Sequence, residues 1–322
     1  MNMTTNNTND KGSRSALIVV GVAVLILGIA AVALGTVGGF VSRSQETTEH
    51  DAEAVSLDLR ASGGVEIIGA DTDTITVESR ISDPWGRLTT EETVEDGTLT
   101  IKSHCAVAWL PTFGDCSAHY VLTVPTATEV TGGGDNGDIG IEALTESVDV
   151  STANGEITVV DVDGRVDLRT DNGDVEVSGA NGDVTVQTSN GSVDVLDTTA
   201  PEMIDVTTSN GAVKISNTTG DLRLETDNGQ IDITDAQAGT ISALTSNEAI
   251  IMNLSSSPER ITAQADNGEI EIGLPQDAPA YDIEMTTNNA TSNVEGIVDD
   301  PNAPFSITAT TSNGDIWLGL RP

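Results

Sequence analysis

Residues 170–177 read TDNGDVEV, and variants of this octet return throughout the C-terminal part of the chain. The dipeptide Asn-Gly within it recurs at Asn136, Asn154, Asn172, Asn190, Asn210, Asn228, Asn267 and Asn313. The first gaps are 18, 18, 18, 20 and 18 residues, and Asn247 and Asn293 fill two missing places without the glycine. A short, nearly fixed period predicts a stacked repeat architecture.

Each repeat reads as a turn followed by a strand. Asn-Gly favours a turn because both residues tolerate positive φ. Apolar residues then alternate with polar ones, as Val175 and Val177 do around Glu176, which predicts a strand with one buried face. Weaker turn signals at Asp163 and Asn181 each fall nine residues after an Asn-Gly. The rung is therefore expected to hold about 18 residues in two strand-turn halves.

These patterns predict an all-β protein, a single-stranded parallel β-solenoid of about 18 residues per rung, with one N-terminal transmembrane helix. The expected organisation is a short cytoplasmic tail at 1–15, a transmembrane signal anchor at 16–41, a polar linker at 42–53, an N-terminal β region and cap at 54–130, and solenoid repeats at 131–322.

The membrane prediction depends on residues 16–41, which contain no charged side chain. This run exceeds the roughly 20 apolar residues that a membrane span needs. Lys11 and Arg14 precede it and Arg43 follows it, which favours an N-terminus inside and a C-terminal domain outside the cell. We therefore expect a single-pass protein of the cell membrane. The alternative is a cleaved signal peptide that ends at the small residues 31–33.

The charge balance narrows the classes of partner. Asp and Glu total 51 against 13 Lys and Arg, giving a net charge of −38. Such a surface repels nucleic acid and anionic lipid headgroups. It is typical of proteins in concentrated salt, which screens the self-repulsion, so we expect a haloarchaeal or other high-salt source.

The two cysteines, Cys105 and Cys116, flank a short loop. Outside the cell, such a pair predicts a disulfide. Together with His104 and His119 the same pair could instead bind zinc. Because His104 and Cys105 are adjacent and point to opposite faces of a strand, zinc is the weaker interpretation.

Side-chain amides at the turns are expected to stack into a structural column formed by Asn136, Asn154, Asn172, Asn190, Asn210, Asn228, Asn247, Asn267 and Asn313. The alternative, an acidic calcium ladder, lacks the spacing of known calcium-binding loops. Four glycosylation sequons lie beyond the apolar segment, at Asn190, Asn217, Asn253 and Asn289.

The sequence offers few candidates for catalysis. Acidic pairs such as Asp135 with Asp138 recur with the repeat, so no pair stands apart as a general acid and base. Arg165 and Arg169 could bind an anion, but pairing with neighbouring acids is the simpler expectation. We therefore expect a non-enzyme without cofactor or metal.

Five segments carry a resemblance to a known family: VSLDLRASGGVEIIGADTDTITVES (55–79), EDGTLTIKS (95–103), YVLTVPTATEV (120–130), DNGDIGIEAL (135–144) and TTSNGDIWLGL (310–320). They resemble the DUF4097 β-strand-repeat family, also called toastrack or adhesin head domain. The resemblance implies an extracytoplasmic β-solenoid, often tethered to a membrane segment. It implies adhesin-like surface proteins or outer sensor parts of envelope-stress systems, and no catalytic residues.

The sequence thus favours a membrane-anchored, extracellular, adhesin-like or envelope structural protein. The alternatives are an envelope-stress sensor ectodomain and, less well supported, a polysaccharide-acting enzyme. Expected partners are the membrane through one helix, envelope components, glycans and other surface proteins, but not nucleic acid. Self-association is expected through the solenoid ends, where the edge at 311–320 would need a cap.

Overall fold

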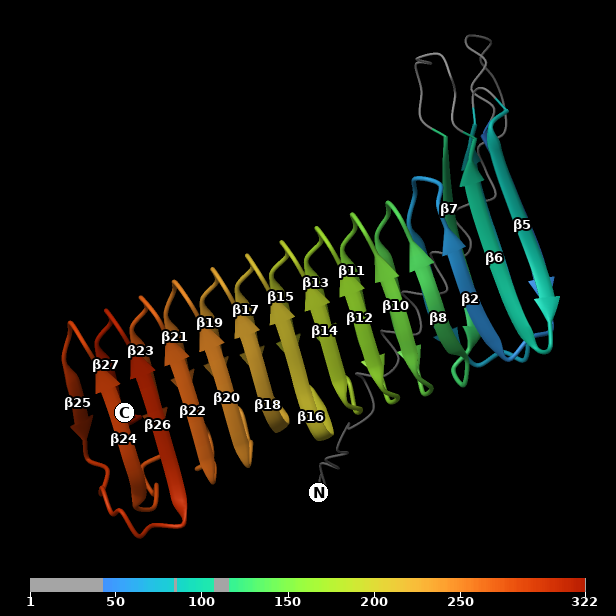
Figure 1. The fold of residues 1–322 in the computed structure, drawn as a ribbon. Coiled ribbons are helices and arrows are strands. Elements are labelled where there is room, and N and C mark those ends of the chain that lie inside the picture. Colours follow the sequence, from blue (N-terminus) through green and yellow to red (C-terminus); the bar gives the residue numbers. More distant parts are fainter. Residues whose placement is uncertain (1–42, 84–85, 107–115, 322) are drawn as a thin grey trace, which may run out of the picture. The chain divides into compact units, whose positions relative to one another are not determined.

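The computed structural model describes residues 43–83, 86–106 and 116–321, and its regular elements there are strands in two sheets (Figure 1). In spatial order, sheet A contains β1 (Arg43–His50), β4 (Ile75–Ser82), β7 (Ser117–Pro125), β3 (Val65–Ala70), β9 (Ile139–Leu144), β11 (Ile157–Val162), β13 (Val175–Ser178), β15 (Val193–Leu196), β17 (Val213–Ser216), β19 (Ile231–Thr234), β21 (Ile250–Asn253), β23 (Ile270–Leu274), β27 (Ile316–Leu320) and β25 (Ser292–Glu295). Sheet B contains β24 (Tyr281–Thr287), β26 (Phe305–Thr311), β22 (Arg260–Ala265), β20 (Thr240–Thr245), β18 (Thr219–Thr226), β16 (Thr199–Thr208), β14 (Val184–Thr188), β12 (Val166–Thr170), β10 (Val148–Thr152), β8 (Glu129–Gly134), β2 (Ala54–Leu59), β6 (Thr98–Cys105) and β5 (Leu88–Glu95).

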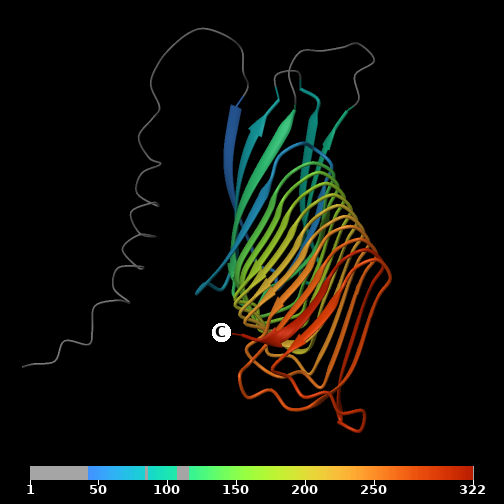
Figure 2. The ribbon, with the colours of Figure 1, turned by 90° about the vertical axis from the view of Figure 1, so that its left-hand side faces the viewer.

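Each rung gives one strand to each sheet, and neighbouring rungs pair in parallel. Val148 of β10 pairs with Val166 of β12, and Ile157 of β11 pairs with Val175 of β13, so both offsets are 18 residues. The two sheets face each other across a narrow interior, as the view in Figure 2 shows. The prediction of an all-β, parallel solenoid with an 18-residue rung of two halves is confirmed.

The interior is a stack of aliphatic side chains from alternate strand positions. In β12, Val166 and Leu168 are fully buried, whereas Asp167 and Arg169 point outward. Burial of one such aliphatic side chain contributes about 1.5–3 kcal/mol, and the contribution repeats from rung to rung. Each half-rung needs only two or three apolar residues, because the rungs above and below complete the core.

The 20-residue gap between Asn190 and Asn210 has a local cause. In β16 the pairing with β18 shifts between Thr199 and Met203, which leaves extra residues in a bulge. Because the bulge absorbs the insertion, the register is restored at Met203, which pairs with Asp221.

Chain order and spatial order differ at both ends of the stack. Near the N-terminal end, β2 lies between β6 and β8, and β3 lies between β7 and β9. The second rung in sequence, β6 and β7, therefore lies outside the first, β2 and β3. At the other end, β26 and β27 lie between β22/β23 and β24/β25. The expectation that 311–320 forms the terminal edge is therefore wrong, and the edge strands are β24 and β25. The last rung pairs on both sides, which removes the chain end from an exposed edge.

The expected linker at 42–53 also requires correction, because residues 43–50 form β1, antiparallel to β4. Its polar sequence suits an edge strand, which contacts water and discourages further pairing. His50 Nε2 of β1 lies 2.8 Å from Glu92 Oε2 of β5, and Thr48 Oγ1 donates to the same oxygen at 2.6 Å. These contacts join the outermost strands of sheets A and B.

The predicted tail at 1–15 and membrane span at 16–41 lie outside the described residues. Within the described ranges the structure contains no helix that is long and apolar enough to cross a membrane.

Candidate functional site

The structure places all nine expected asparagines in one hydrogen-bonded ladder. Each Nδ2 donates to the Oδ1 of the preceding ladder member over 2.7–3.1 Å: Asn154 to Asn136, Asn172 to Asn154, Asn190 to Asn172, Asn210 to Asn190, Asn228 to Asn210, Asn247 to Asn228, Asn267 to Asn247 and Asn313 to Asn267. A neutral amide suits a stacked column because it both donates and accepts, without like-charge repulsion. Asn293 is not a member of this ladder, because it lies within β25. Asn289 takes that place, and its Nδ2 donates to Asn313 Oδ1 at 2.8 Å.

A second ladder, of threonines, was missed by sequence reasoning. At seven of the nine ladder positions the residue two before the asparagine is a buried threonine, and Thr170 shows its bonding. Its Oγ1 donates to Gly155 O of the preceding rung at 3.2 Å and accepts from Gly173 N at 3.2 Å. The same two bonds are made by Thr188, Thr208, Thr226 and Thr311. The recurring threonine was visible in the sequence as part of the turn motif, but its inward direction was not.

The turn glycines have a different role from the one expected. None of the Asn-Gly ladder residues has a positive φ, so the turn does not need the left-handed conformation. Instead, a Cβ on Gly173 would lie 1.6 Å from Gly155 O, and a Cβ on Gly191 would lie 1.7 Å from Gly173 O. The glycines are required because the next rung approaches closely. Positive φ occurs at the opposite corner, for example at Asp161 and Asp197.

The acids beside the ladder hold neighbouring rungs together. Asp138 Oδ1 accepts from Glu156 N at 3.0 Å, and Asp174 Oδ1 accepts from Ser192 N at 2.8 Å. Asp315 accepts from both the backbone N and the Oγ1 of Thr291, and these bonds lower its pKa. These carboxylates therefore act as hydrogen-bond acceptors for exposed backbone, a structural role.

The candidate anion site at Arg165 and Arg169 is occupied by carboxylates. Arg169 Nη2 lies 3.0 Å from Asp167 Oδ1, and Arg165 Nη2 lies 3.8 Å from Asp167 Oδ2. A further contact of 3.4 Å joins Arg169 to Asp149. Both guanidinium groups are thus paired with acids of the same face.

Cys105 and Cys116 form a disulfide between the end of β6 in sheet B and the start of β7 in sheet A. The bond ties the two sheets together at the N-terminal end of the stack. Because both sulfurs are used, the zinc alternative with His104 and His119 is wrong. Over the described ranges no group of three or more His, Cys, Asp or Glu side chains is placed to hold a metal ion.

The sequon asparagines differ in how their nitrogen is used. Asn190 Nδ2 donates to Asn172 Oδ1 and Asp171 O, so both of its hydrogens are engaged. Asn217 Nδ2 donates to Asp197 Oδ1 at 2.5 Å, and Asn289 donates within the ladder. Asn253 is half-buried at the end of β21. Glycosylation at these positions stays a prediction, and at Asn190 and Asn289 it would break ladder bonds.

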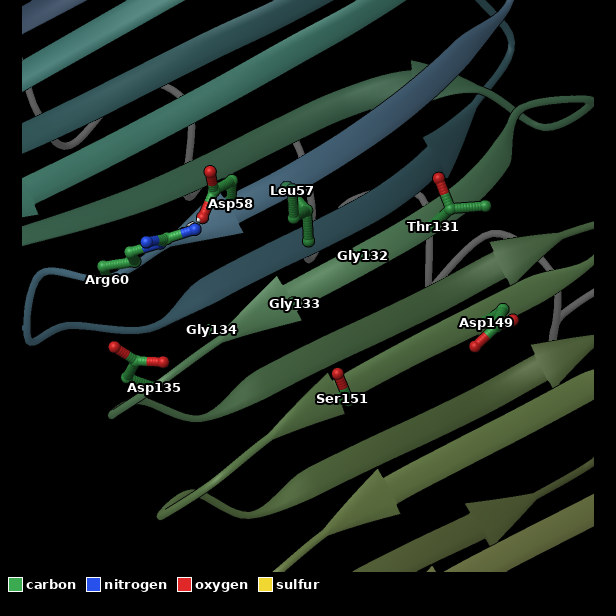
Figure 3. Close-up of a pocket in the computed structure, with 10 residues that line it drawn as sticks. All are labelled: Leu57, Asp58, Arg60, Thr131, Gly132, Gly133, Gly134, Asp135, Asp149 and Ser151. Carbon is green, nitrogen blue, oxygen red and sulfur yellow. Dashed lines mark hydrogen bonds and ion pairs between the residues drawn. The ribbon is translucent and has the colours of Figure 1, made fainter.

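One part of the outer face departs from the repeat. A groove of about 570 Å³ crosses sheet B where β8 lies between β2 and β10 (Figure 3). Its floor is Gly132, Gly133 and Gly134, and its polar walls are Asp58, Arg60, Thr131, Asp135, Asp149 and Ser151. Gly133 pairs with Asp58 on one side and Ser151 on the other. Along this column later rungs carry larger side chains such as Arg169 and Gln187. A Cβ on Gly133 would lie 1.8 Å from Ser151 O, so the groove floor carries no side chain there.

The charges of this groove are mixed. Arg60 Nε donates to Asp58 Oδ1 at 2.8 Å, and the neighbouring carboxylate raises the pKa of Arg60. A second hollow of about 410 Å³ shares Asp58 and Arg60 and adds Glu91, Lys102 and His104. Both cationic and anionic groups therefore line these two hollows between β5 and β10. Sequence reasoning missed this site; the run Gly132–Gly134 was its only visible signal.

The fold and this surface define a class: parallel β-solenoids whose polar outer faces surround a thin aliphatic core. The chain belongs to the family described as Toastrack DUF4097, whose model matches residues 53–318. This confirms the family resemblance found in the sequence. No curated protein shows significant sequence similarity to the chain.

Solved structures of low sequence identity also match. A candidate cell adhesion protein from Clostridium sporogenes is 10% identical, with 87% of this chain and 100% of that chain covered and a TM-score of 0.25. A candidate lipid-binding protein from Parabacteroides distasonis is 16% identical, with 85% and 98% covered and a TM-score of 0.42. A candidate adhesin from Bacteroides fragilis is 13% identical, with 86% and 97% covered and a TM-score of 0.29.

Proposed function

We propose that this protein is a non-catalytic, adhesin-like module of the cell envelope. In this proposal residues 16–41 anchor it as a single-pass membrane protein, and the solenoid faces the outside. Its polar faces then contact envelope components, glycans or other surface proteins. Membership of the toastrack family supports this role.

The groove on sheet B is the observation that carries the proposal. Several acids of the repeats accept hydrogen bonds between rungs, as Asp174 does. In the groove, Asp149 and Arg60 are paired with Arg169 and Asp58, and both remain exposed beside a glycine floor. Carboxylates and a guanidinium there match the hydroxyl groups of a glycan chain, and the glycines let the ligand approach the backbone.

The test is binding of glycans extracted from the envelope to the full-length protein in lipid nanodiscs. The double variant Arg60→Ala with Asp149→Ala should weaken binding about tenfold or more, because hydrogen bonds to charged groups are worth about 1.5–3 kcal/mol each. The matched control is Arg223→Ala, which removes an exposed arginine from β18 on the same face, outside the groove. Equal binding by the groove variant and the control would reject the groove as the contact surface.

The full-length protein also serves to test the two alternative functions, an envelope-stress sensor and a polysaccharide-acting enzyme. Recovery of a specific regulator with residues 1–15 would favour an envelope-stress sensor. Release of shortened sugars from the glycans would favour an enzyme. Cleavage of the solenoid by protease added to intact cells tests the proposed orientation, and protection from it would contradict an extracellular location.

A further inference from the structure

The Asn-Gly pairs of the ladder are chemically reactive groups as well as structural ones. The backbone nitrogen of the glycine can attack the side-chain carbonyl carbon of the asparagine, because glycine has no side chain to hinder the approach. The reaction needs an asparagine side chain that can turn toward the main chain. It also needs a glycine N–H that is not held in another hydrogen bond.

Two hydrogen bonds oppose this reaction along most of the ladder. At Asn172 the side-chain amide donates to Asn154 Oδ1 at 2.8 Å, which fixes the side chain. The N–H of Gly173 donates to Thr170 Oγ1 at 3.2 Å, which fixes the attacking nitrogen. Both bonds are also present at Asn190, Asn210, Asn228 and Asn313.

Asn136, the first member of the ladder, has neither restraint. Among the described residues its Nδ2 has no hydrogen-bond partner, and its Oδ1 only accepts from Asn154. The position of the threonine is occupied by Gly134, which offers no hydroxyl to Gly137 N. Gly137 is also half-buried, whereas the glycines after the other ladder asparagines are buried.

From these three differences we infer that Asn136 is a site of spontaneous deamidation in the folded protein. Gly137 N attacks Asn136 Cγ, the new C–N bond closes a succinimide ring, and the Cγ–Nδ2 bond breaks. The proton from Gly137 N leaves with Nδ2 as ammonia. One water then opens the ring to aspartate or isoaspartate, so the reaction consumes a water, releases ammonia and transfers no electrons.

The position of Asn136 also predicts that the ladder tolerates an aspartate there. Asn136 is used only as an acceptor, and a carboxylate accepts from Asn154 Nδ2 equally well. At Asn190 a carboxylate would face the acceptor oxygens Asn172 Oδ1 and Asp171 O. Isoaspartate is a different case, because it lengthens the main chain beside Gly137, where a Cβ would lie 1.7 Å from Gly63 O.

The new charge would lie next to Asp135, at the rim of the groove on sheet B. Deamidation therefore makes the groove more acidic as the protein ages. This inference depends on the hydrogen bonds of the ladder and not on the proposed glycan binding.

The experiment is peptide mapping of the full-length protein after incubation in mildly alkaline buffer made with ¹⁸O-water. The label should enter Asn136 about tenfold or more faster than Asn172, Asn190, Asn210 or Asn228, because two hydrogen bonds of about 1 kcal/mol each are missing. In urea these positions should react at similar rates. Folded protein in which Asn172 reacts as fast as Asn136, or in which Asn136 stays unlabelled, overturns the inference.

Two variants make the test sharper. Thr170→Val frees Gly173 N and should accelerate deamidation of Asn172 while leaving the rate at Asn136 unchanged. Asn136→Asp should keep the melting temperature, whereas Asn190→Asp should lower it. Equal losses in these two aspartate variants would contradict the acceptor-only role of Asn136.

Discussion

Asn313 donates its side-chain amide to Asn267 Oδ1 at 2.8 Å, although 46 residues separate the two in the chain. The intervening rung, β24 and β25, is not between them in space but lies outside both. The last rung in sequence, β26 and β27, therefore lies inside the stack, between two rungs that precede it in the chain. The same occurs at the other end of the stack, where the first rung, β2 and β3, lies between two rungs that follow it in the chain.

This arrangement predicts that a C-terminal truncation is more damaging than removal of an internal rung. Deletion of 304–322 removes β26 and β27, which leaves Tyr281 and Ile283 of β24 without Phe305 and Ile307. Deletion of 172–189 removes one full rung and lets Asn190 stack on Asn154 with the register kept. Exposing the two side chains of β24 should cost an additional 3 kcal/mol or so. Urea unfolding of both variants measures the difference, and equal stability would contradict the reversed order.

The threonine ladder predicts that replacing one buried hydroxyl by a methyl group lowers the stability of the protein markedly. Thr188→Val keeps the shape of the side chain but leaves Gly173 O and Gly191 N without their hydroxyl partner. Buried unsatisfied groups of this kind cost about 1–3 kcal/mol. The control is Thr185→Val in the same strand, whose side chain faces outward and should change stability by about 0.5 kcal/mol or less. A thermal melt of each variant checks the contrast.

The column of turn glycines predicts that the stability lost on a Gly→Ala substitution depends on how close the added Cβ comes to the neighbouring rung. Gly191→Ala should destabilise by about 1–3 kcal/mol or more, because its Cβ would lie 1.7 Å from Gly173 O. Gly140→Ala should be neutral, since its Cβ would meet only Glu66 Cγ at 3.9 Å. Chemical denaturation of both variants is the measurement. A stable Gly191→Ala protein would show that the corner has room that the geometry excludes.

The two tyrosines predict an alkaline transition. Burial raises the pKa of Tyr281 to about 12, and burial together with Glu92 raises that of Tyr120 to about 12. The folded state therefore holds both phenol protons more tightly than the unfolded state does. Their contribution to stability is complete below pH 10 and is lost as the pH rises toward 12. Because the chain has only two tyrosines, phenolate absorbance reports on them directly, and a midpoint near 10 in folded protein would contradict their burial.

The net charge of −38 predicts that salt stabilises the solenoid. Carboxylates recur at every rung, so repulsion acts along the whole stack. Raising ionic strength from 0.1 to 1 M shortens the screening length from about 10 to about 3 Å, so the melting temperature should rise. Sodium and potassium chloride at equal strength should act alike. A melting temperature that does not change with salt would rule out repulsion as a significant term.

Most of the repeat could be predicted because its information is local. Alternating residues such as Val175 and Val177 specify the buried face, and Asn172 specifies the corner, within one octet. The role of β1 could not be predicted in this way. Its polar residues resemble a linker, and only the antiparallel partner β4 makes them a strand.

The groove on sheet B likewise combines features that are visible in the sequence with others that only the tertiary structure shows. The glycines at 132–134 are visible in the sequence, but the groove exists because Gly133 lies between Asp58 and Ser151. These residues come from three strands, and Asp58 is distant from the other two in sequence. The disulfide was predictable from the pairing of two cysteines, although its placement between the two sheets was not.

The sequence by itself determined the rung length, the parallel coil, the aliphatic core and the asparagine column. Each follows from a two-residue alternation and a corner motif that repeat at one period. Only the tertiary structure decided the order of the end rungs, the hydroxyl ladder, the reason for the glycines and the groove. Those features depend on which backbone lies one rung away, and at the ends of the stack that neighbour is not the next repeat in the chain.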